Sequence, residues 1–288
     1  MDSYSTQPAL SMTARKQATA AGGSADVSVV DRRSALRGLL CDAITERRAI
    51  ERITASLERG EGGWVLTPNL DILRRYKNDR SFRELVSETN LRLVDGMPLV
   101  WASRLAGVPV PERVPGSSLV ISLAEALAAE GRSLYLLGGE AGAAEGAAAE
   151  LVERFPGLRV CGTHCPPMGF ETDPSAMAEI ERRLGEAEPD VVYVALGSPK
   201  QERLIASLRE RHPRAWWLGV GVSLSFLSGQ LKRAPRWMQR CGLEWAHRLR
   251  NEPRRLYRRY LRQGLPFAAM LGLWAVRERV RRMWRNRG

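Results

Sequence analysis

The sequence predicts an α/β fold: a Rossmann-like, mainly parallel sheet with helices on both faces, followed by a basic helical C-terminal appendage. Short apolar runs recur along the chain with helical segments between them, an order typical of βα units. Polar motifs follow several of these runs, and open α/β sheets bind ligands at the carboxyl ends of their strands. Basic residues gather near the C-terminus.

The predicted elements alternate along the chain. Apolar runs bounded by turn residues predict strands at 63–67, 91–94, 133–137, 158–162, 191–196 and 215–220. The segments between them predict helices at 35–59, 70–76, 81–89, 98–106, 118–130, 142–155, 176–186 and 200–211. Pro98 and Pro199 stand where helices start, a position that proline favours.

The chain divides into three predicted regions. Residues 1–34 have little apolar periodicity and no secretory signal, so we expect a flexible N-terminal extension. Residues 35–232 form the predicted Rossmann-like domain, and residues 233–288 form the appendage. A chain of 288 residues with 44% apolar content is long enough for one sizeable core. Four irregularly spaced cysteines suit a reducing compartment, so we expect a cytoplasmic protein.

Charge is distributed unevenly. The whole chain carries a formal net charge of +12, whereas residues 231–288 alone hold 17 Lys or Arg against three Glu, a net of +14. The first 230 residues are therefore almost neutral. Such asymmetry indicates a polyanionic partner for the C-terminal region: an anionic membrane, a phosphorylated ligand or nucleic acid.

An uncharged apolar run covers residues 263–276 within this basic region. Gly and Pro interrupt it, and it is too short to span a bilayer. Arginines follow the run and Trp274 and Trp284 lie in or near it, which fits a segment in the interface of an anionic leaflet. A helix that docks on the core with a solvated basic face is the alternative. The apolar run favours lipid over nucleic acid as the partner.

Polar residues follow the first two predicted strands of the sheet. Thr67 and Asn69 offer a hydroxyl and an amide to a ligand, or they form a turn and the N-cap of the next helix. Asp95 ends the next strand and precedes Gly96, as expected of a general base exposed in a cleft. Capping of the following helix is the alternative role of Asp95. None of the three histidines belongs to a nucleophile motif.

Two further motifs lie where a helix follows a predicted strand. Gly138 and Gly139 lie between a predicted strand and a helix, where backbone N–H groups can approach a nucleotide diphosphate. An ordinary strand-to-helix turn has the same sequence. Gln201 and Glu202 occupy the first turn of another helix and can be ordinary first-turn residues. Only the joint occurrence of these motifs indicates one shared site.

Eight motifs follow one another in a fixed order. They are Thr67-x-Asn69, Asp95-Gly96, Glu112-Arg113-Val114-x-Gly116, Leu137-Gly138-Gly139, Gly197-x-Pro199-Lys200-Gln201-Glu202, Arg233-Ala234-Pro235, Glu244-Trp245 and Glu252-Pro253-x-Arg255. From about residue 49 to residue 261 this order resembles the WecG/TagA/CpsF family of bacterial glycosyltransferases. The resemblance implies an inverting, metal-independent hexosyltransferase that moves a sugar from a UDP-sugar to a polyprenyl-diphosphate-linked saccharide in cell-surface polysaccharide synthesis. The implied sugar is N-acetylmannosamine, its uronic acid, or a hexose such as glucose.

The resemblance also implies roles for single residues. Asp95 falls on the position of the proposed general base, and Arg113 on a position that assists catalysis. Positions expected to bind the donor correspond to Thr67, Asn69, Gln201 and Ser225, with Gly138 and Gly139 added on the physical grounds above. Ser225 stands where an Asp is common. The acceptor diphosphate contacts correspond to Arg248, Arg255 and Arg258.

The expected ligands follow from these roles. The partners are a UDP-sugar, a polyprenyl-diphosphate-linked acceptor and an anionic membrane surface, with no nucleic acid and with room for a homo-oligomer. We expect no cofactor and no metal, because the chain has no Asp-x-Asp motif and arginines can neutralise a diphosphate. Cys161, His164 and Cys165 lack a fourth ligand. The expected location is the cytoplasmic face of the membrane, bound peripherally. The alternative function is a membrane-tethered UDP-nucleotide-binding regulatory module without transferase activity.

Overall fold

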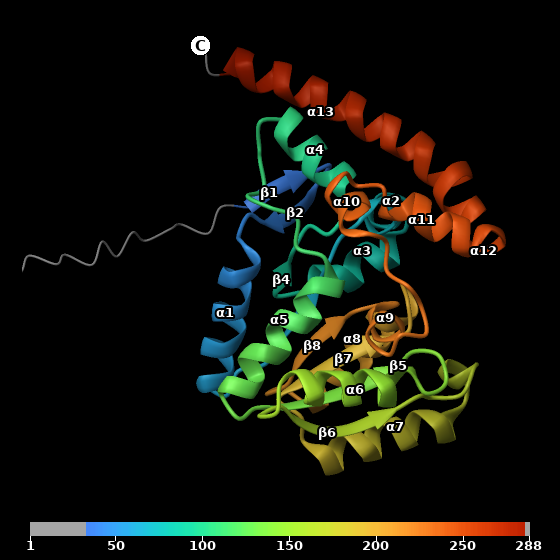
Figure 1. Ribbon diagram of the computed structural model, residues 1–288. Coiled ribbons are helices and arrows are strands. Elements are labelled where there is room, and N and C mark those ends of the chain that lie inside the picture. Colours follow the sequence, from blue (N-terminus) through green and yellow to red (C-terminus); the bar gives the residue numbers. More distant parts are fainter. Residues whose placement is uncertain (1–32, 286–288) are drawn as a thin grey trace, which may run out of the picture. The chain divides into compact units, whose positions relative to one another are not determined.

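A six-stranded parallel sheet forms the centre of the described part of the protein (Figure 1). The computed structural model describes residues 33–285, without the side chains of Arg236, Arg240 and Arg255. In spatial order the strands are β4 (Leu91–Arg92), β3 (Gly63–Leu66), β8 (Trp216–Gly219), β7 (Val191–Ala195), β5 (Ser133–Gly138) and β6 (Arg159–His164). The predicted α/β fold with a mainly parallel sheet is confirmed. Residues 1–32 of the predicted N-terminal extension lie outside the described residues.

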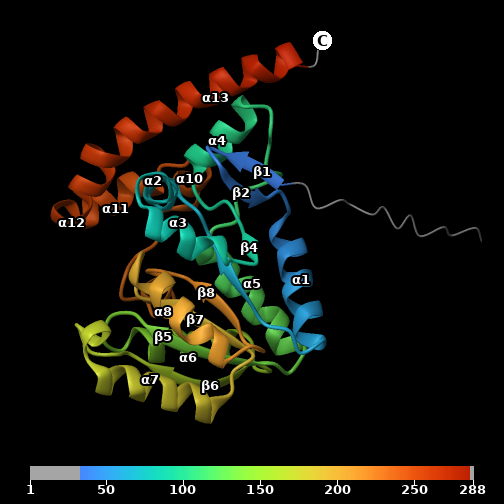
Figure 2. The same ribbon diagram turned by 180° about the vertical axis from the view of Figure 1, so that it is seen from behind.

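Helices cover both faces of this sheet (Figures 1 and 2). One face packs against α1 (Glu46–Glu58), α5 (Gly116–Ala129), α6 (Ala143–Arg154) and α9 (Ser223–Leu227), and the other against α7 (Pro174–Ala187) and α8 (Lys200–Leu208). Leu134 and Leu136 of β5 belong to the first core, and Tyr135 and Leu137 belong to the second. Because successive side chains of a strand point to opposite faces, a doubly covered strand is apolar at every position. This is why the strands appear in the sequence as continuous apolar runs.

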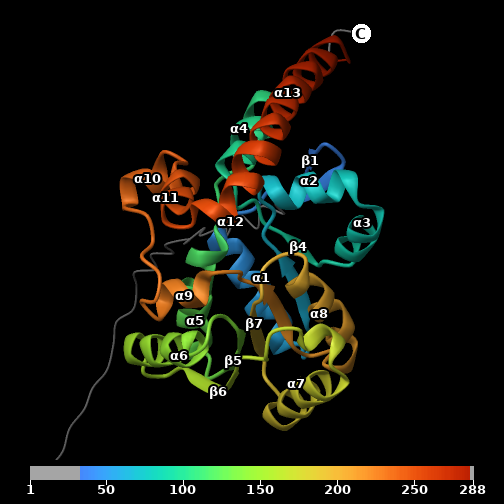
Figure 3. The same cartoon turned by 90° about the vertical axis from the view of Figure 1, so that its right-hand side faces the viewer.

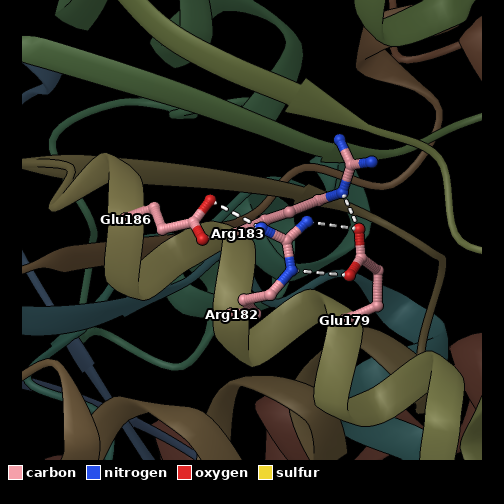
Figure 4. A network of polar contacts seen from close by, with 4 residues as sticks. All are labelled: Glu179, Arg182, Arg183 and Glu186. Carbon is pink, nitrogen blue, oxygen red and sulfur yellow. Dashed lines mark hydrogen bonds and ion pairs between the residues drawn. The ribbon is translucent and has the colours of Figure 1, made fainter.

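Helix α7 carries a network of charged side chains (Figure 4). Arg182 donates to Glu179 (Nε to Oε2, 2.9 Å) and to Glu186 (Nη1 to Oε1, 2.6 Å), and Arg183 Nε donates to Glu179 Oε1 (2.6 Å). The partners are three or four residues apart, which places them on neighbouring turns. These pairs are partly exposed to solvent, so they contribute little to stability.

The segment before α1 differs from the prediction. A helix over residues 35–59 is expected from the sequence, but residues 33–42 form an antiparallel hairpin of β1 (Arg33–Leu36) and β2 (Leu39–Asp42). Arg37 and Gly38 form its turn, both with positive φ, the geometry that matches the twist of a two-residue hairpin. The helix starts only after Thr45, whose hydroxyl caps it. The predicted helix is therefore wrong over its first eleven residues.

The other predicted helices of the body are present with small shifts of their ends, and α9 was not predicted. They include α2 (Leu70–Asn78), α3 (Arg80–Ser87) and α4 (Met97–Leu105). Strand β4 is shorter than expected and ends at Arg92, but the chain stays beside β3 beyond that point. The Leu93 N–H donates to the Leu66 carbonyl at 2.9 Å, and the Asp95 N–H donates to the Pro68 carbonyl at 2.9 Å. The two chain segments therefore reach the carboxyl edge of the sheet together.

The appendage is helical, as predicted. It consists of α10 (Arg236–Arg240), α11 (Glu244–Asn251), α12 (Pro253–Tyr257), a π-helical segment (Arg258–Gly264) and α13 (Leu265–Arg285). Helix α13 lies beside α4 (Figure 3) and buries Phe267, Leu271 and Ala275 in a cluster shared with α4 and the hairpin. Burial of these three side chains stabilises the docked helix by roughly 4–6 kcal/mol. Within the described residues, no helix has both the length and the apolar character needed to cross a bilayer.

Candidate active site

A cavity of about 600 Å³ lies at the carboxyl edge of the sheet. The body supplies part of its wall from the segments that follow β3, β4, β7 and β8, including Thr67, Asp95, Gly197 and Gly221. Helices of the body such as α4 also contribute, and the appendage adds α11, the π-helical segment and α13. This volume is typical of sites for small molecules and cofactors. The cavity is therefore enclosed only when the appendage is docked on the body.

Asp95 lines the cavity beyond the end of β4. Helix α4 begins after Gly96, and no side chain caps its N-terminus. Capping of this helix by Asp95, the alternative left open by the sequence, is therefore wrong. A Cβ on Gly96 would stand only 3.3 Å from the Cα of Asn69, so glycine allows the two strand ends to approach closely. The Asp95 carboxyl is left for a ligand in the cavity.

The environment of Asp95 favours its protonated form more than water does. Part of its surface is open to the cavity, but burial raises the pKa of Asp95 to about 6, and the Arg113 guanidinium opposes this shift. Glu244 raises the pKa further, whereas Arg233 and Arg248 lower it. A carboxylate with this pKa is ionised at pH 7 and still accepts a proton readily, which suits a general base.

Arg113 and Arg233 meet at one carboxylate of the appendage. Glu244 Oε2 lies 3.6 Å from Arg113 Nη1, and Glu244 Oε1 lies 3.6 Å from Arg233 Nε. Arg233 Nη1 also donates to the Ser117 carbonyl at 3.4 Å, at the start of α5. These side chains are 16–22% exposed, so water screens their charges little, and Arg113 and Glu244 line the cavity. Glu244 thus ties α11 to the body beside Asp95.

Thr67 and Asn69 both line the cavity. The Asn69 Oδ1 accepts from the N–H groups of Asp71 and Ile72 at 3.0 and 3.1 Å, so Asn69 is the N-cap of α2, the structural role considered for it from the sequence. The capping bonds use only its carbonyl oxygen, and the Nδ2 group can still donate to a ligand. Thr67 lies against Gly116 at the start of α5, where an added Cβ would come within 3.4 Å of the hydroxyl.

Gln201 is buried at the edge of the cavity, and its amide orientation is fixed. Its Oε1 accepts from the Gly221 N–H at 3.1 Å, and its Nε2 donates to Glu202 Oε1 at 3.2 Å. Glu202 is fully buried, and burial raises the pKa of its carboxyl. A Cβ on Gly219 would stand 2.5 Å from Gln201 Nε2, so only glycine leaves room for this side chain. Glu202 therefore serves to orient Gln201.

Gly138 and Gly139 do not line the cavity. Strands β8 and β7 separate their strand, β5, from β3, which puts the ends of β5 and β3 roughly 14 Å apart. Both glycines have φ above +90°, and a Cβ on Gly139 would stand 2.9 Å from the Ala143 side chain. The turn itself thus requires glycine. Contact with the donor diphosphate stays a prediction for these two residues and for Ser225, which is buried in α9 and also lies outside the cavity lining.

The arginines expected at the acceptor diphosphate divide into three cases. Arg248 of α11 lines the cavity. Arg258 is exposed and does not line it, and the side chain of Arg255 lies outside the description. The next residue, Arg259, does line the cavity, and its Nε lies 3.2 Å from Asp71 Oδ2 in the first turn of α2. Roles for Arg255 and Arg258 stay predictions.

Several residues of the cavity wall had no role predicted from the sequence. Glu244 and Trp245 form one of the motifs, but no function was expected of either, and Tyr260 and Arg259 also line the appendage side of the wall. Asp71 was recognisable only as an acidic residue in the first turn of a helix. Asp71 pairs with Arg259, which lies far away in the sequence. A local sequence pattern cannot predict such a contact.

A search of the described residues for metal ligands gives no group of three or more His, Cys, Asp or Glu side chains. Cys161 Sγ donates to the Leu134 carbonyl at 3.4 Å, and Cys165 Sγ donates to the Gly139 carbonyl at 3.3 Å. Both thiols therefore take part in the packing at the end of β6.

Comparison with known proteins gives this site a context. The model of the family described as "Glycosyl transferase WecG/TagA/CpsF family" matches residues 34–283, from the hairpin to α13. An N-acetylglucosaminyldiphosphoundecaprenol N-acetyl-beta-D-mannosaminyltransferase of Bacillus subtilis (strain 168) is 31% identical over 188 residues, which cover 65% of this chain and 71% of the relative. A protein of the same name from Bacillus spizizenii is 32% identical over 212 residues, which cover 72% and 78% of the two chains. The resemblance of the motifs is confirmed, and the chain belongs to the WecG/TagA/CpsF family of glycosyltransferases.

Proposed function

We propose that this protein is an inverting, metal-independent glycosyltransferase that moves a sugar from a UDP-sugar to a polyprenyl-diphosphate-linked saccharide. The names of the two relatives favour N-acetylmannosamine as the sugar and N-acetylglucosaminyl diphosphate as the head of the acceptor. One observation carries the proposal: a carboxylate with a raised pKa faces a cavity together with guanidinium groups from the body and from the appendage. A base beside fixed cations is the arrangement that transfer from a diphosphate requires.

Asp95 is the general base in this proposal. Its carboxylate takes the proton from the acceptor hydroxyl, and the hydroxyl oxygen forms a bond to the anomeric carbon of the donor. The bond between that carbon and the diphosphate oxygen breaks on the opposite side, so the configuration inverts and UDP leaves with the electron pair. General base catalysis of this kind contributes about 10²–10⁴-fold to the rate.

Arginines neutralise the charge that develops on the leaving diphosphate. Arg113 and Arg233 stand beside Asp95, and Arg248 faces it from α11. Guanidinium groups donate two parallel hydrogen bonds to phosphate oxygens and keep their charge at every physiological pH. Their presence in a site of low exposure supports a mechanism in which cations of the protein carry out the task that a metal ion performs in other transferases.

The exposed face of α13 supports attachment to a membrane. Leu273, Val276, Val280 and Trp284 are 46–73% exposed, and arginines flank them on the same helix. Apolar side chains bordered by cations partition into the interface of an anionic leaflet. We infer that α13 lies on the cytoplasmic face of the cell membrane, where lipid-linked sugars are accessible.

The direct test is a transfer assay with a panel of UDP-sugars and a polyprenyl-diphosphate N-acetylglucosamine analogue, read by product mass. We expect one donor to give a product heavier by a single glycosyl unit, and the one-bond coupling between C1 and H1 of the new sugar to report inversion. Binding of UDP without transfer by any pair would contradict the proposal and favour a regulatory nucleotide-binding module.

A further inference from the structure

The cavity continues away from Asp95 as an apolar groove between α4 and α13. These two helices lie side by side (Figure 3), and both contribute to the cavity wall. The groove is lined by Trp101, Ala102 and Leu105 of α4 and by Leu265, Ala268 and Gly272 of α13. All six residues are apolar. A polar ligand such as a nucleotide or a sugar would lose hydrogen bonds to water here without gaining any in return.

The two ends of the cavity have different chemistry. Near Asp95 the wall carries the guanidinium groups of Arg113, Arg248 and Arg259, which suit an anionic group. Along the groove, Trp101, Leu105 and Leu265 are 47–52% exposed, so the apolar wall faces solvent. A ligand that matches both ends has an anionic head and an aliphatic tail.

Gly272 keeps the groove open. An added Cβ at this position would meet no atom within 4 Å, so the space above it is empty. The residue has an ordinary helical backbone, and glycine weakens the interior of a helix relative to alanine. Packing within the protein therefore does not require glycine here, and a larger side chain at this position would project into the groove.

We propose that the groove between α4 and α13 holds the first isoprene units of the lipid-linked acceptor, with the acceptor diphosphate at the arginines near Asp95. The inference takes its acceptor from the proposed function. A branched aliphatic chain covers the apolar walls, and the attached diphosphate pairs with the cations. A phospholipid acyl chain supplies a tail but no diphosphate in register with the arginines. The groove also opens toward the exposed side chains of α4 and α13, from which the remainder of the lipid chain can extend.

Binding of prenyl diphosphates without any sugar tests the groove directly. We expect farnesyl diphosphate, with 15 carbons, to bind wild-type protein at least about tenfold more tightly than dimethylallyl diphosphate, with five, because the longer tail buries more apolar surface. In Gly272→Leu the leucine side chain fills the groove. This variant should bind the five-carbon ligand with wild-type affinity and should bind the 15-carbon ligand no more tightly. Isothermal titration calorimetry gives both affinities.

The matched control is Gly185→Leu, on α7. Gly185 is also a helical glycine with no atom within 4 Å of an added Cβ, and it does not line the cavity. This control should keep the wild-type preference for the longer tail. Equal affinities of wild type for both ligands, or a wild-type preference retained by Gly272→Leu, would overturn the groove assignment.

The outcomes separate this inference from the proposed function. Tail-dependent binding that Gly272→Leu abolishes, in a protein that transfers no sugar, supports the groove and contradicts the transferase. Transfer of sugar to five-carbon and 15-carbon acceptors with the same kcat/KM supports the transferase and contradicts the groove.

Discussion

At the residue scale, Asp95 is subject to opposing influences. Burial and the neighbouring Glu244 favour the protonated carboxyl, whereas arginines on both sides of the cavity favour the carboxylate. Burial prevails, and the pKa rises to about 6. The residue is therefore strong enough as a base to accept a hydroxyl proton, yet it is still ionised under physiological conditions.

We predict that Asp95→Asn lowers kcat by about 10²–10⁴-fold at saturating substrates, because the amide cannot accept the proton. The affinity for UDP should stay near that of wild type. The measurement is product formation under saturating donor and acceptor, with UDP affinity from calorimetry as the control for folding. Near-normal turnover of the variant would remove Asp95 from the role of base.

The same substitution should stabilise the protein. Asp95 has a pKa of about 6 in the fold against its usual value of 3.8, so its ionisation destabilises the native state as the pH rises between these values. The amide that replaces the carboxyl has no charge to desolvate. We expect the free energy of unfolding of Asp95→Asn to exceed that of wild type by about 1–3 kcal/mol at pH 8 and to match it near pH 3. Urea titrations at the two pH values give the difference, and an equal effect at both would contradict the titration of Asp95.

Glu244 should contribute to the position of the acidic limb of the pH–activity profile, because its charge adds to the effect of burial on the pKa of Asp95. Wild-type kcat/KM is expected to fall below about pH 6, where Asp95 becomes protonated. In Glu244→Gln the nearby negative charge is lost, so the pKa of Asp95 falls and the limb moves to lower pH. Glu244→Asp keeps the charge and serves as the control. A limb that stays at the wild-type pH in Glu244→Gln would show that the charge of Glu244 does not act on the base.

At the element scale, α13 has one face docked on the body and a second apolar row that stays exposed, so docking leaves a surface free for the proposed membrane contact. One face docks on the body through Phe267, Leu271 and Ala275. A second row, which includes Leu273, Val276 and Val280, remains exposed. The two rows coexist because, at about 3.6 residues per turn, positions 267, 271 and 275 lie on the opposite side of the helix from positions 273, 276 and 280.

We predict that the double variant Leu273→Glu and Val280→Glu weakens binding to vesicles of anionic phospholipid by at least about tenfold, because two apolar groups are replaced by charges that the leaflet repels. Both side chains are exposed, so folding and UDP affinity should be unchanged. Co-sedimentation with vesicles is the measurement. Val152→Glu, an exposed position on α6, should bind vesicles nearly as wild type does. Unimpaired pelleting of the double variant would exclude this face of α13 as the membrane contact.

The sequence predicted well those elements whose signal is local. Strand β7 is a continuous run of Val, Tyr and Ala because it is buried on both faces. Asp95 is recognisable because it follows the apolar run of residues 91–94, although β4 itself ends at Arg92. The hairpin was missed because its turn is Arg37-Gly38, which lacks the Asn or Asp common in such turns. Gly138 lies away from the cavity because of the order of strands in space, and this order cannot be read from the chain.

Contacts between the appendage and the body also could not be predicted from the sequence. Arg259 faces the cavity while its neighbour Arg258 faces solvent, and a π-helical segment begins at this point of the chain. A π turn changes the angle between successive side chains, so spacing rules for an α-helix fail there. The partner of Arg259, Asp71, lies far earlier in the chain.

At the scale of the whole molecule, a nearly neutral body carries a strongly basic end. Residues 231–288 have a net charge of +14 within a chain of +12. Charge gathered in this way acts over about one Debye length, which is about 10 Å at 0.1 M salt. It therefore attracts an anionic surface before any side chain makes contact.

We predict that binding of the full chain to anionic vesicles weakens by roughly tenfold or more when salt is raised from about 0.05 M to about 0.5 M, because the ions screen this attraction. Neutral vesicles should show weaker binding that changes little with salt, since only the apolar row of α13 contributes. Co-sedimentation across the salt series measures both. Salt-independent binding to anionic vesicles, or strong binding to nucleic acid with none to vesicles, would contradict a membrane role for the charge.

The buried cluster around α13 links the two ends of the described chain. Leu36 and Leu39 of the hairpin lie in the same cluster as Phe267 and Leu271, although almost the entire polypeptide separates them. The hairpin also packs against α4, so α13 completes a cluster to which earlier elements already contribute. Removal of α13 would expose apolar side chains of this cluster to water and would delete one wall of the cavity. The same helix therefore supports both the stability of the fold and the shape of the site.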